Sequence, residues 1–270
     1  MHRPPGLVIL CYVAHSGKKT LDRVLSRAGL CSRTQARALI AASRVQVNGH
    51  VVRDPDSWID LVRDHVACDG EPLRARKKEV CMLHKPVGYV TTANDEHDRP
   101  TVYSLMPKDT AWLAPVGRLD QDTSGLLLFT NDSDLANAIT DPASKLPKTY
   151  EVLCEGQLGD EAIAQLAAGV QLDDGPTQPA IVERIGGDEH TTLLRLVVSE
   201  GRNRQIRRMV TAIGSRVQAL HRTQIGPVCL ADLPGGDMRR LLATELQALR
   251  AAVTAPRDHR RPRTSPDRAH

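Results

Sequence analysis

The sequence predicts an α+β protein in which a small α/β domain precedes a larger domain built on a mixed, mainly antiparallel sheet. Segments with strand-like and helix-like periodicity alternate irregularly along the 270 residues, without any repeat. The composition, with 41% apolar and 25% charged residues, is that of a globular chain with a sizeable core. We therefore expect helices packed on the larger sheet.

The first seventeen residues precede the first regular pattern. Leu7 to Ala14 is an apolar run of eight residues, which is too short to span a bilayer and lacks a small-residue cleavage site. We expect residues 1–17 to be a disordered leader and the protein to be cytoplasmic. The six scattered cysteines have no Cys-x-x-Cys pair and no zinc-like spacing, so we expect them to be small buried residues in a reducing compartment.

Residues 18–73 predict two short helices followed by a hairpin. After Thr20, which can cap a helix, apolar residues recur with helical spacing as far as Gly29. Ser32-Arg33-Thr34-Gln35 has the form of a capping box and starts the second helix. Val45–Val52 alternates around an Asn-Gly pair, which is a strong hairpin signal.

The same region is strongly basic. Between Lys18 and His50 there are seven Lys and Arg residues and a single acid, Asp22, although the whole chain carries only +4. Such a local excess is typical of a phosphate-binding face. Arg33 and Arg37 lie one turn apart on the second helix, although this pair alone fits a solvated helix face equally well. Trp58 is expected to pack beneath this domain.

Residues 74–79 are polar and basic and indicate a linker. Regular patterns resume at Val80 and continue to residue 255, so we expect 80–255 to form the second domain. Pro256–His270, rich in Arg and Pro, is expected to be a disordered basic tail. The expected strands are 80–83, 126–130, 148–153, 193–198 and 217–220, and the expected helices are 101–106 (a single turn), 134–140, 160–168, 205–213 and 241–253.

The stretch around Asp120 is the centre of the second domain. Leu126 to Thr130 is a continuous apolar run, typical of a strand buried on both faces. Just before it, Gly117-Arg118-Leu119-Asp120 places two opposite charges on the same side of Leu119. On their own, these residues favour a structural salt bridge between Arg118 and Asp120.

Common catalytic and metal-binding motifs are missing from the sequence. There is no Gly-rich phosphate loop, no Gly-x-Ser-x-Gly elbow and no His-Glu-x-x-His motif. The acidic pair Asp173-Asp174 is followed by Gly175-Pro176, which indicates a turn. The sequence predicts no metal site.

Residues 18–73 closely resemble the alpha-L type RNA-binding domain that is named after a small-subunit ribosomal protein. The resemblance rests on the two short helices, the Arg-bearing second helix and the Val-x-Val-Asn-Gly hairpin. It implies that the basic face binds structured RNA, with Arg33, Arg37 and Arg44 on phosphates. Contacts of this kind position a protein on RNA without reading the base sequence.

The second domain resembles the pseudouridine synthases, specifically the branch named for the ribosomal small-subunit enzyme RsuA, over about residues 80–249. The resemblance implies the pseudouridine synthase fold. In the opening motif, a His stands where an aromatic residue or Asn is expected. The matching motifs are His84-Lys85-Pro86-x-Gly88, Gly117-Arg118-Leu119-Asp120 with Thr123-x-Gly125-Leu-Leu, Lys148-x-Tyr150, and Glu200 to Met209.

This resemblance implies an enzyme that flips a uridine out of RNA and isomerises it to pseudouridine, with no metal and no cofactor. Asp120 would be the catalytic carboxylate, either as nucleophile at the sugar carbon or as base in an elimination route. Tyr150 would stack on the uracil and assist the final proton removal. Arg207 would keep Asp120 ionised beneath the base.

The remaining basic residues of the motifs are expected at the RNA. Lys85 and Arg118 would contact the flipped nucleotide and its phosphates. Arg202, Arg204 and Arg208 would contact the RNA backbone or have a structural role.

We expect a monomer that acts on ribosomal RNA and not at a membrane. The sequence from Glu200 to Arg204 and the intact first domain favour large-subunit ribosomal RNA as the target. Small-subunit ribosomal RNA and transfer RNA remain alternative targets, and a non-catalytic RNA-binding assembly factor remains an alternative function.

Overall fold

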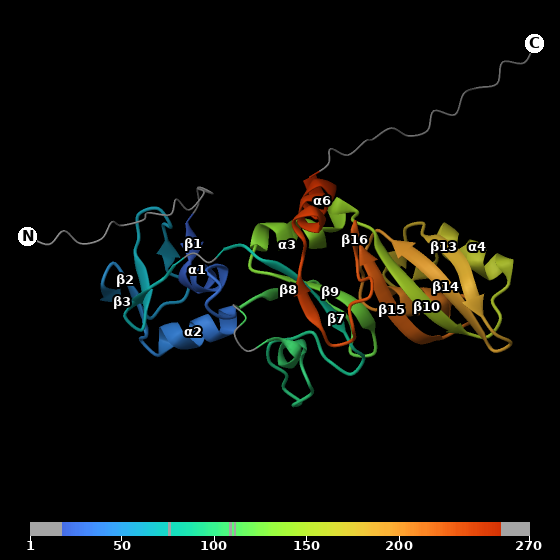
Figure 1. The fold of residues 1–270 in the computed structure, drawn as a ribbon, viewed down its shortest axis with the longest axis horizontal. Coiled ribbons are helices and arrows are strands. Elements are labelled where there is room, and N and C mark those ends of the chain that lie inside the picture. Colours follow the sequence, from blue (N-terminus) through green and yellow to red (C-terminus); the bar gives the residue numbers. More distant parts are fainter. Residues whose placement is uncertain (1–17, 75–76, 108–109, 111, 255–270) are drawn as a thin grey trace, which may run out of the picture.

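The computed structural model describes residues 18–74, 77–107, 110 and 112–254. The predicted leader (1–17) and the predicted tail (256–270) lie outside the described residues. The described chain forms a small unit followed by a larger one, each with its own hydrophobic core (Figure 1).

The small unit consists of two helices packed on each other, a four-stranded sheet of order β3-β2-β5-β6, and the pair β1-β4. The predicted capping box is present, because the backbone N–H of Gln35 donates to Ser32 Oγ and the N–H of Ser32 donates to Gln35 Oε1. Asn48 and Gly49 turn the predicted hairpin with φ of 52° and 82°. The elements are β1 (Lys19–Thr20), α1 (Leu21–Arg27), α2 (Arg33–Ala41), β2 (Val45–Val47), β3 (His50–Val51), β4 (Trp58–Ile59), β5 (Val66–Cys68) and β6 (Glu71–Pro72).

The large unit contains a nine-stranded sheet of order β13-β14-β10-β15-β9-β7-β17, with β16 beside β15 and β8 beside β9. Among the described strands of this sheet, β9 and β15 pair in parallel and the other pairs are antiparallel, which confirms the predicted fold class. The strands are β7 (Val80–Lys85), β8 (Ala114–Val116), β9 (Ser124–Thr130), β10 (Lys148–Glu155), β13 (Ile181–Gly187), β14 (Thr191–Val198), β15 (Val217–Ile225), β16 (Val228–Cys229) and β17 (Met238–Arg240), with β11 (Gln171–Leu172) and β12 (Gly175–Pro176) as a separate pair.

The helices of the large unit pack on different parts of this sheet. Helices α3 and α6 contact each other and lie beside β8 and β16, whereas α4 contacts the edge strand β13 (Figure 1). Helix α5 contacts β11 and the central strand β15. No helix within the described ranges is both long and apolar enough to cross a membrane. The elements are η1 (Val102–Leu105), α3 (Ser133–Thr140), η2 (Pro142–Ser144), α4 (Asp160–Ala168), α5 (Gln205–Ala212) and α6 (Ala243–Thr254).

Strand β9 is buried on both faces, as its apolar run predicts. Leu126 and Leu128 belong to the core beneath α3 and α6, whereas Leu127 and Phe129 belong to the core on the opposite face. All four side chains are fully buried. At about 1.5–3 kcal/mol for each buried side chain, this strand is a rigid support for the segment that precedes it.

The sheet has a narrow junction between β9 and β15, where the parallel ladder pairs Ser124 with His221 and Gly125 with Arg222. Gly125 has φ of +109°, and a Cβ placed on it would lie 2.2 Å from the carbonyl oxygen of Arg222. Glycine is therefore required at this position. On the other edge of β15, a register shift between Thr149 and Tyr150 brings Arg222 opposite Tyr150.

Lys85 lies beneath this junction, and the expectation that it contacts RNA is wrong. It ends β7 with no exposed surface, and its Nζ donates to the carbonyl oxygens of Thr123 (2.7 Å), Pro86 (3.0 Å) and Gln121 (3.5 Å). Burial lowers the pKa of Lys85 to about 8, although Asp122 and Asp120 oppose that shift. Lys85 therefore anchors the turn that carries these two carboxylates.

Two other expectations about burial are wrong. Trp58 is 67% exposed, because the neighbouring Ile59 occupies the inward position of β4 and side chains alternate along a strand. Cys229 is exposed, whereas Cys31, Cys81 and Cys154 are buried.

The described part of the predicted linker contains no helix or strand and is attached to the large unit. Lys78 Nζ lies 2.9 Å from Asp132 Oδ1, and Asn131 bonds the backbone of Lys77 and Glu79. These contacts fix the end of the linker at the start of α3.

We predict that Lys85→Met lowers the free energy of unfolding at pH 7 by about 1–3 kcal/mol, because carbonyl oxygens of the turn lose their donor. The deficit should grow between pH 8 and 10. Over that range the folded Lys85 has released a proton that the unfolded chain retains, since its ordinary pKa is 10.5. Urea unfolding at several pH values measures both effects.

Lys145→Met is the matched control, because Lys145 is exposed and should show neither effect. The lowered pKa of Lys85 would be contradicted if the loss in free energy of unfolding caused by Lys85→Met stayed constant from pH 7 to 10.

Candidate active site

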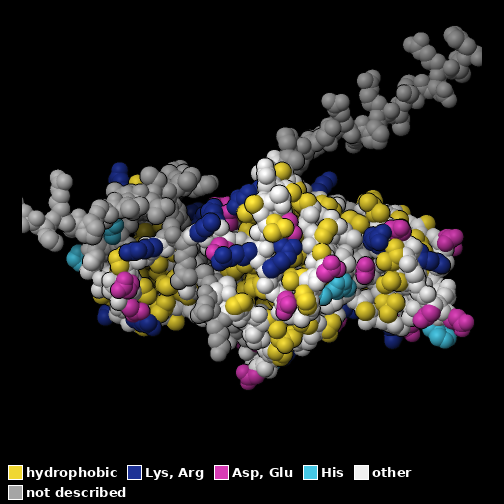
Figure 2. All heavy atoms as spheres, viewed as in Figure 1, with side chains coloured by type: hydrophobic (Ala, Val, Ile, Leu, Met, Phe, Trp, Pro, Cys, Tyr) yellow, Lys and Arg dark blue, Asp and Glu magenta, His cyan; other side chains and the backbone are white. Residues whose placement is uncertain are grey.

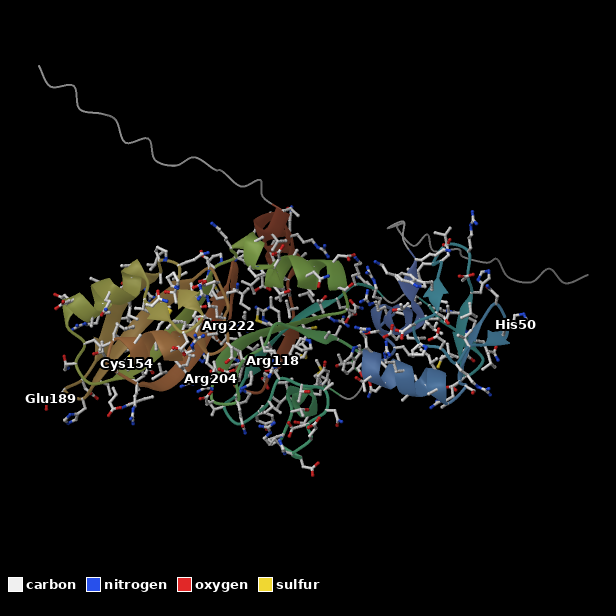
Figure 3. All side chains as sticks on the ribbon, turned by 180° about the vertical axis from the view of Figure 1, so that it is seen from behind. His50, Arg118, Cys154, Glu189, Arg204 and Arg222 are labelled. Carbon is white, nitrogen blue, oxygen red and sulfur yellow. The ribbon has the colours of Figure 1, made fainter. Side chains whose placement is uncertain are left out.

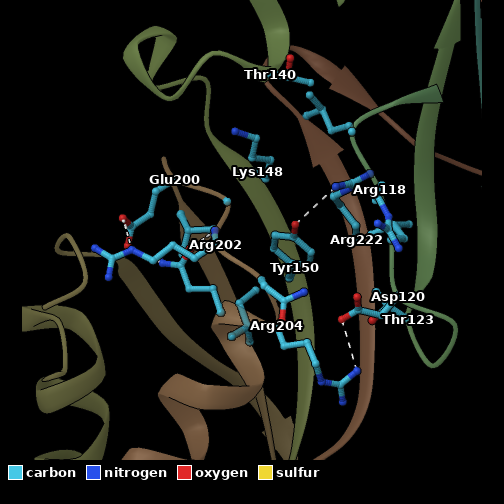
Figure 4. Close-up of a pocket in the computed structure, with 18 of the residues that line it drawn as sticks. Arg118, Asp120, Thr123, Thr140, Lys148, Tyr150, Glu200, Arg202, Arg204 and Arg222 are labelled. Atoms are coloured by element: carbon cyan, nitrogen blue, oxygen red, sulfur yellow. Dashed lines mark hydrogen bonds and ion pairs between the residues drawn. The ribbon is translucent and has the colours of Figure 1, made fainter. Parts of the chain in front are cut away.

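A cavity of about 400 Å³ lies at the junction of β9, β10 and β15 (Figure 4). Its walls come from segments that are far apart in the sequence. Arg118, Arg204 and Arg222 lie close together at the middle of the sheet when the molecule is seen from behind (Figure 3). The cavity is lined by residues 116–120, Thr123, Lys148, Tyr150 and residues 200–206, together with Ile139, Thr140, Pro142, Val198, Leu220, Arg222 and Ile225.

Asp120 stands on a tightly held turn before β9. The buried Leu119 is fixed by Thr91, whose hydroxyl donates to its carbonyl oxygen (2.7 Å) and accepts its N–H (3.2 Å). The N–H of Thr123 donates to the carbonyl of Asp120 and closes the turn. The Asp120 side chain is 33% exposed and lines the cavity, so its oxygens are accessible from the cavity.

The cation beside Asp120 is Arg204, and the predicted pairing with Arg207 is wrong. Arg204 Nη1 lies 3.5 Å from Asp120 Oδ2, and its Nη2 lies 3.0 Å from Asp122 Oδ2. Arg207 instead donates from Nη2 to the carbonyl of Asp122 (2.8 Å), and its Nε lies 3.3 Å from the Asp122 carboxylate. The sequence reasoning also missed Asp122, which contacts both arginines.

The position of Arg204 explains this difference. It has left-handed dihedrals (φ 45°, ψ 33°) at the residue before α5, which directs its side chain toward the turn. Arg207 lies on the first turn of α5 and reaches Asp122. Burial raises the pKa of Asp122, but the hydrogen bond from Arg204 and the charge of Arg207 together hold it below its ordinary value.

Tyr150 faces the same cavity from near the start of β10. Its ring packs against the hydrophobic core that α4 and α5 cover. Arg222 Nη1 donates to the Tyr150 hydroxyl at 3.5 Å, and the guanidinium carbon lies 6.0 Å from the ring centroid. The structure thus brings the predicted residues Asp120 and Tyr150 to one cavity.

The other predicted RNA-contacting arginines of this unit have different environments. Arg118 is exposed and lines the cavity. Arg202 and Arg208 both bind the turn at Asp174, at 3.3 Å and 2.6 Å, and Arg202 also pairs with Glu200. These contacts support the structural alternative for Arg202 and Arg208. The predicted turn at Asp173-Asp174 is present.

The predicted arginines of the small unit surround one buried carboxylate. Asp22 Oδ2 accepts hydrogen bonds from Arg33 (2.8 Å) and Arg37 (3.1 Å). Burial raises the pKa of Asp22, but the bonds from Thr20 and both arginines lower it to about 2. Arg44 pairs with Asp69 at 2.6 Å.

The basic surface of the small unit remains accessible. The side chains of Arg33, Arg37 and Arg44 are all about half exposed. Lys and Arg side chains gather over the small unit and its border with the large unit (Figure 2). Within the described residues, no group of three or more His, Cys, Asp or Glu side chains could hold a metal ion.

Comparisons with known proteins identify relatives of both units. The family model of RNA pseudouridylate synthase matches residues 79–212, and the model of the S4 domain matches residues 19–57. A solved structure described as a pseudouridylate synthase superposes with a TM-score of 0.62 and 34% identity, covering 85% of this chain and 99% of that chain.

Curated relatives match over almost their whole length. An uncharacterized RNA pseudouridine synthase of Aquifex aeolicus (strain VF5) is 38% identical over 234 residues, which are 86% of this chain and 94% of that protein. The Ribosomal large subunit pseudouridine synthase B of Bacillus subtilis (strain 168) is 36% identical over 233 residues, 86% of this chain and 95% of that protein. The chain therefore belongs to the RNA pseudouridylate synthase family, and it is an RNA pseudouridine synthase of the RsuA-like branch with an S4 domain in front.

Proposed function

We propose that the protein converts one or more uridines of large-subunit ribosomal RNA to pseudouridine, with Asp120 as the reacting carboxylate. The convergence of Asp120 and Tyr150 on one cavity carries this proposal. The name of the Bacillus subtilis relative supports large-subunit RNA as the target. Small-subunit ribosomal RNA and transfer RNA remain alternative targets.

The isomerisation breaks the bond between C1′ and N1 of the uridine and joins C1′ to C5 of the rotated uracil. In one route, the Asp120 carboxylate forms an ester at C1′ and leaves when C5 attacks. In the other, it takes the C2′ proton, so that the uracil leaves and a C1′=C2′ double bond forms, and the proton returns to C2′ as C5 adds to C1′. In both routes N1 gains a proton and C5 loses one, so the reaction is redox-neutral. The contact between Asp120 and Arg204 is long, at 3.5 Å, which leaves the carboxylate available for either route.

The target base has to leave the RNA stack before it can reach Asp120. Tyr150 offers a ring that the core supports from behind, and stacking on such a ring contributes roughly 1–3 kcal/mol per base. This contribution partly offsets the cost of unstacking. Tyr150 is therefore the proposed platform for the uracil, and it would assist the loss of the C5 proton.

The small unit would hold the surrounding RNA. Asp22 already holds Arg33 and Arg37 in place, and both side chains are about half exposed. They would therefore lose little further conformational entropy on binding phosphates. These phosphate contacts would position the RNA, and the large unit would select the base.

We predict that Asp120→Asn lowers turnover by roughly 10³-fold or more, because the amide is neither a nucleophile nor a base. RNA affinity should stay within about threefold, since phosphate contacts dominate it. The measurement is pseudouridine mapping on unmodified ribosomal RNA transcripts, together with a filter-binding assay. Asp173→Asn removes an exposed carboxylate that does not line the cavity and should leave turnover unchanged. An active Asp120→Asn variant would show that another carboxylate reacts.

We also predict that Arg33 and Arg37 contribute two phosphate contacts. Removing them alone would leave Asp22 buried and unpaired, so the test compares Asp22→Asn with the triple variant Asp22→Asn, Arg33→Ala, Arg37→Ala. The slope of log affinity against log salt should be shallower by about 1.4 to 1.8 in the triple variant. Equal slopes for the two proteins would mean that these arginines do not bind phosphate.

A further inference from the structure

The cavity holds more positive charge than its own carboxylates neutralise. Five Lys and Arg side chains line it, and two of them pair with its acids, Arg202 with Glu200 and Arg204 with Asp120. The other three cations have no carboxylate of the described residues within 4 Å. They are Arg118, Lys148 and Arg222.

Arg222 has an unused hydrogen-bond donor in this cavity. Its side chain is buried, with only 5% of the residue exposed, and Nε donates to the carbonyl of Leu126 at 2.7 Å. Nη1 makes the long bond to Tyr150, and the buried Nη2 has no partner. A buried N–H without an acceptor is costly, and this one belongs to a fixed cation that lines the cavity wall.

Lys148 adds a second charge on the same wall. It precedes Tyr150 by two residues on β10, so both side chains lie on the same face of the strand (Figure 4). Burial lowers the pKa of Lys148, and the charge of Arg222 lowers it further. An anion bound between these two cations would relieve their repulsion and supply the missing acceptor.

We propose that Arg222 and Lys148 form the binding site for a phosphate that flanks the target uridine, with Arg118 at the exposed side of that site. This inference rests on the proposed function, because it takes the cavity to hold a flipped nucleotide. A guanidinium offers parallel N–H donors that match two phosphate oxygens, and Lys148 contributes a point charge. In this proposal Arg222 and Lys148 make the phosphate contact that the sequence suggested for Lys85, which is buried.

The location of this site also links phosphate binding to the stacking platform. Arg222 contacts the Tyr150 hydroxyl with one nitrogen, so the phosphate and the uracil would occupy adjacent positions along β10 and β15. A nucleotide held at both points has its sugar between them, on the side where Asp120 lines the cavity.

The test compares the binding of uridine, uridine 5′-monophosphate and uridine 3′-monophosphate by NMR titration. For the wild-type protein, one of the two monophosphates should bind at least about tenfold more tightly than uridine. Arg222→Gln should abolish this preference, and Lys148→Gln should reduce it several-fold. Arg195→Gln is the matched control, because Arg195 is exposed on β14 and outside the cavity, and it should keep the full preference.

Lys148→Gln keeps the test decisive if Arg222→Gln fails to fold, since Lys148 makes no described hydrogen bond with its side chain. Equal binding of uridine and both monophosphates by the wild-type protein would overturn the proposal. So would a preference that persists in a folded Lys148→Gln protein at the wild-type level. Because the titration requires no turnover, it gives a result even if Asp120 proves not to be the reacting carboxylate.

Discussion

The close approach of Gly125 to Arg222 is the contact on which the rest of the site depends. It joins the two halves of the sheet in parallel, and a side chain at position 125 would collide with the backbone of Arg222. On one side of this contact, the turn before β9 carries Asp120. On the other side, β10 supplies Tyr150, and Arg222 itself lies opposite that ring. The cavity therefore lies where the two halves of one sheet meet, each packed on its own hydrophobic core.

Three cations with different roles hold the turn between these halves. Lys85 binds the backbone of the turn from below, whereas Arg204 and Arg207 reach it from the start of α5. Asp122 accepts both arginines and so ties the turn to the helix. Among the described residues, this arrangement leaves Asp120 with one long ion pair and a place on the cavity wall, which suits the role of reacting carboxylate that we propose for it.

The sequence predicted the local features well, because these depend on neighbouring residues. The buried run of β9, the boundaries of α4 and the capping box of α2 follow from periodicity and capping chemistry. The partner of Asp120 could not be predicted, since it depends on the left-handed conformation of Arg204. Arg222 was missed because only the register shift in β15 brings it opposite Tyr150. The basic motifs likewise gave no sign that Lys85 would be buried.

The structure of the protein bound to a fragment of an RNA that it modifies, with 5-fluorouridine at the modified position, tests the proposed site most directly. The fluorine at C5 prevents the final proton loss and so retains the nucleotide in the site. We expect the base to stack on Tyr150 and the sugar to lie within about 3.5 Å of the Asp120 carboxylate, with a flanking phosphate bound by Arg222 and Lys148. A nucleotide that remains stacked in the RNA, or one that lies in the cavity with its sugar away from Asp120, would contradict this expectation.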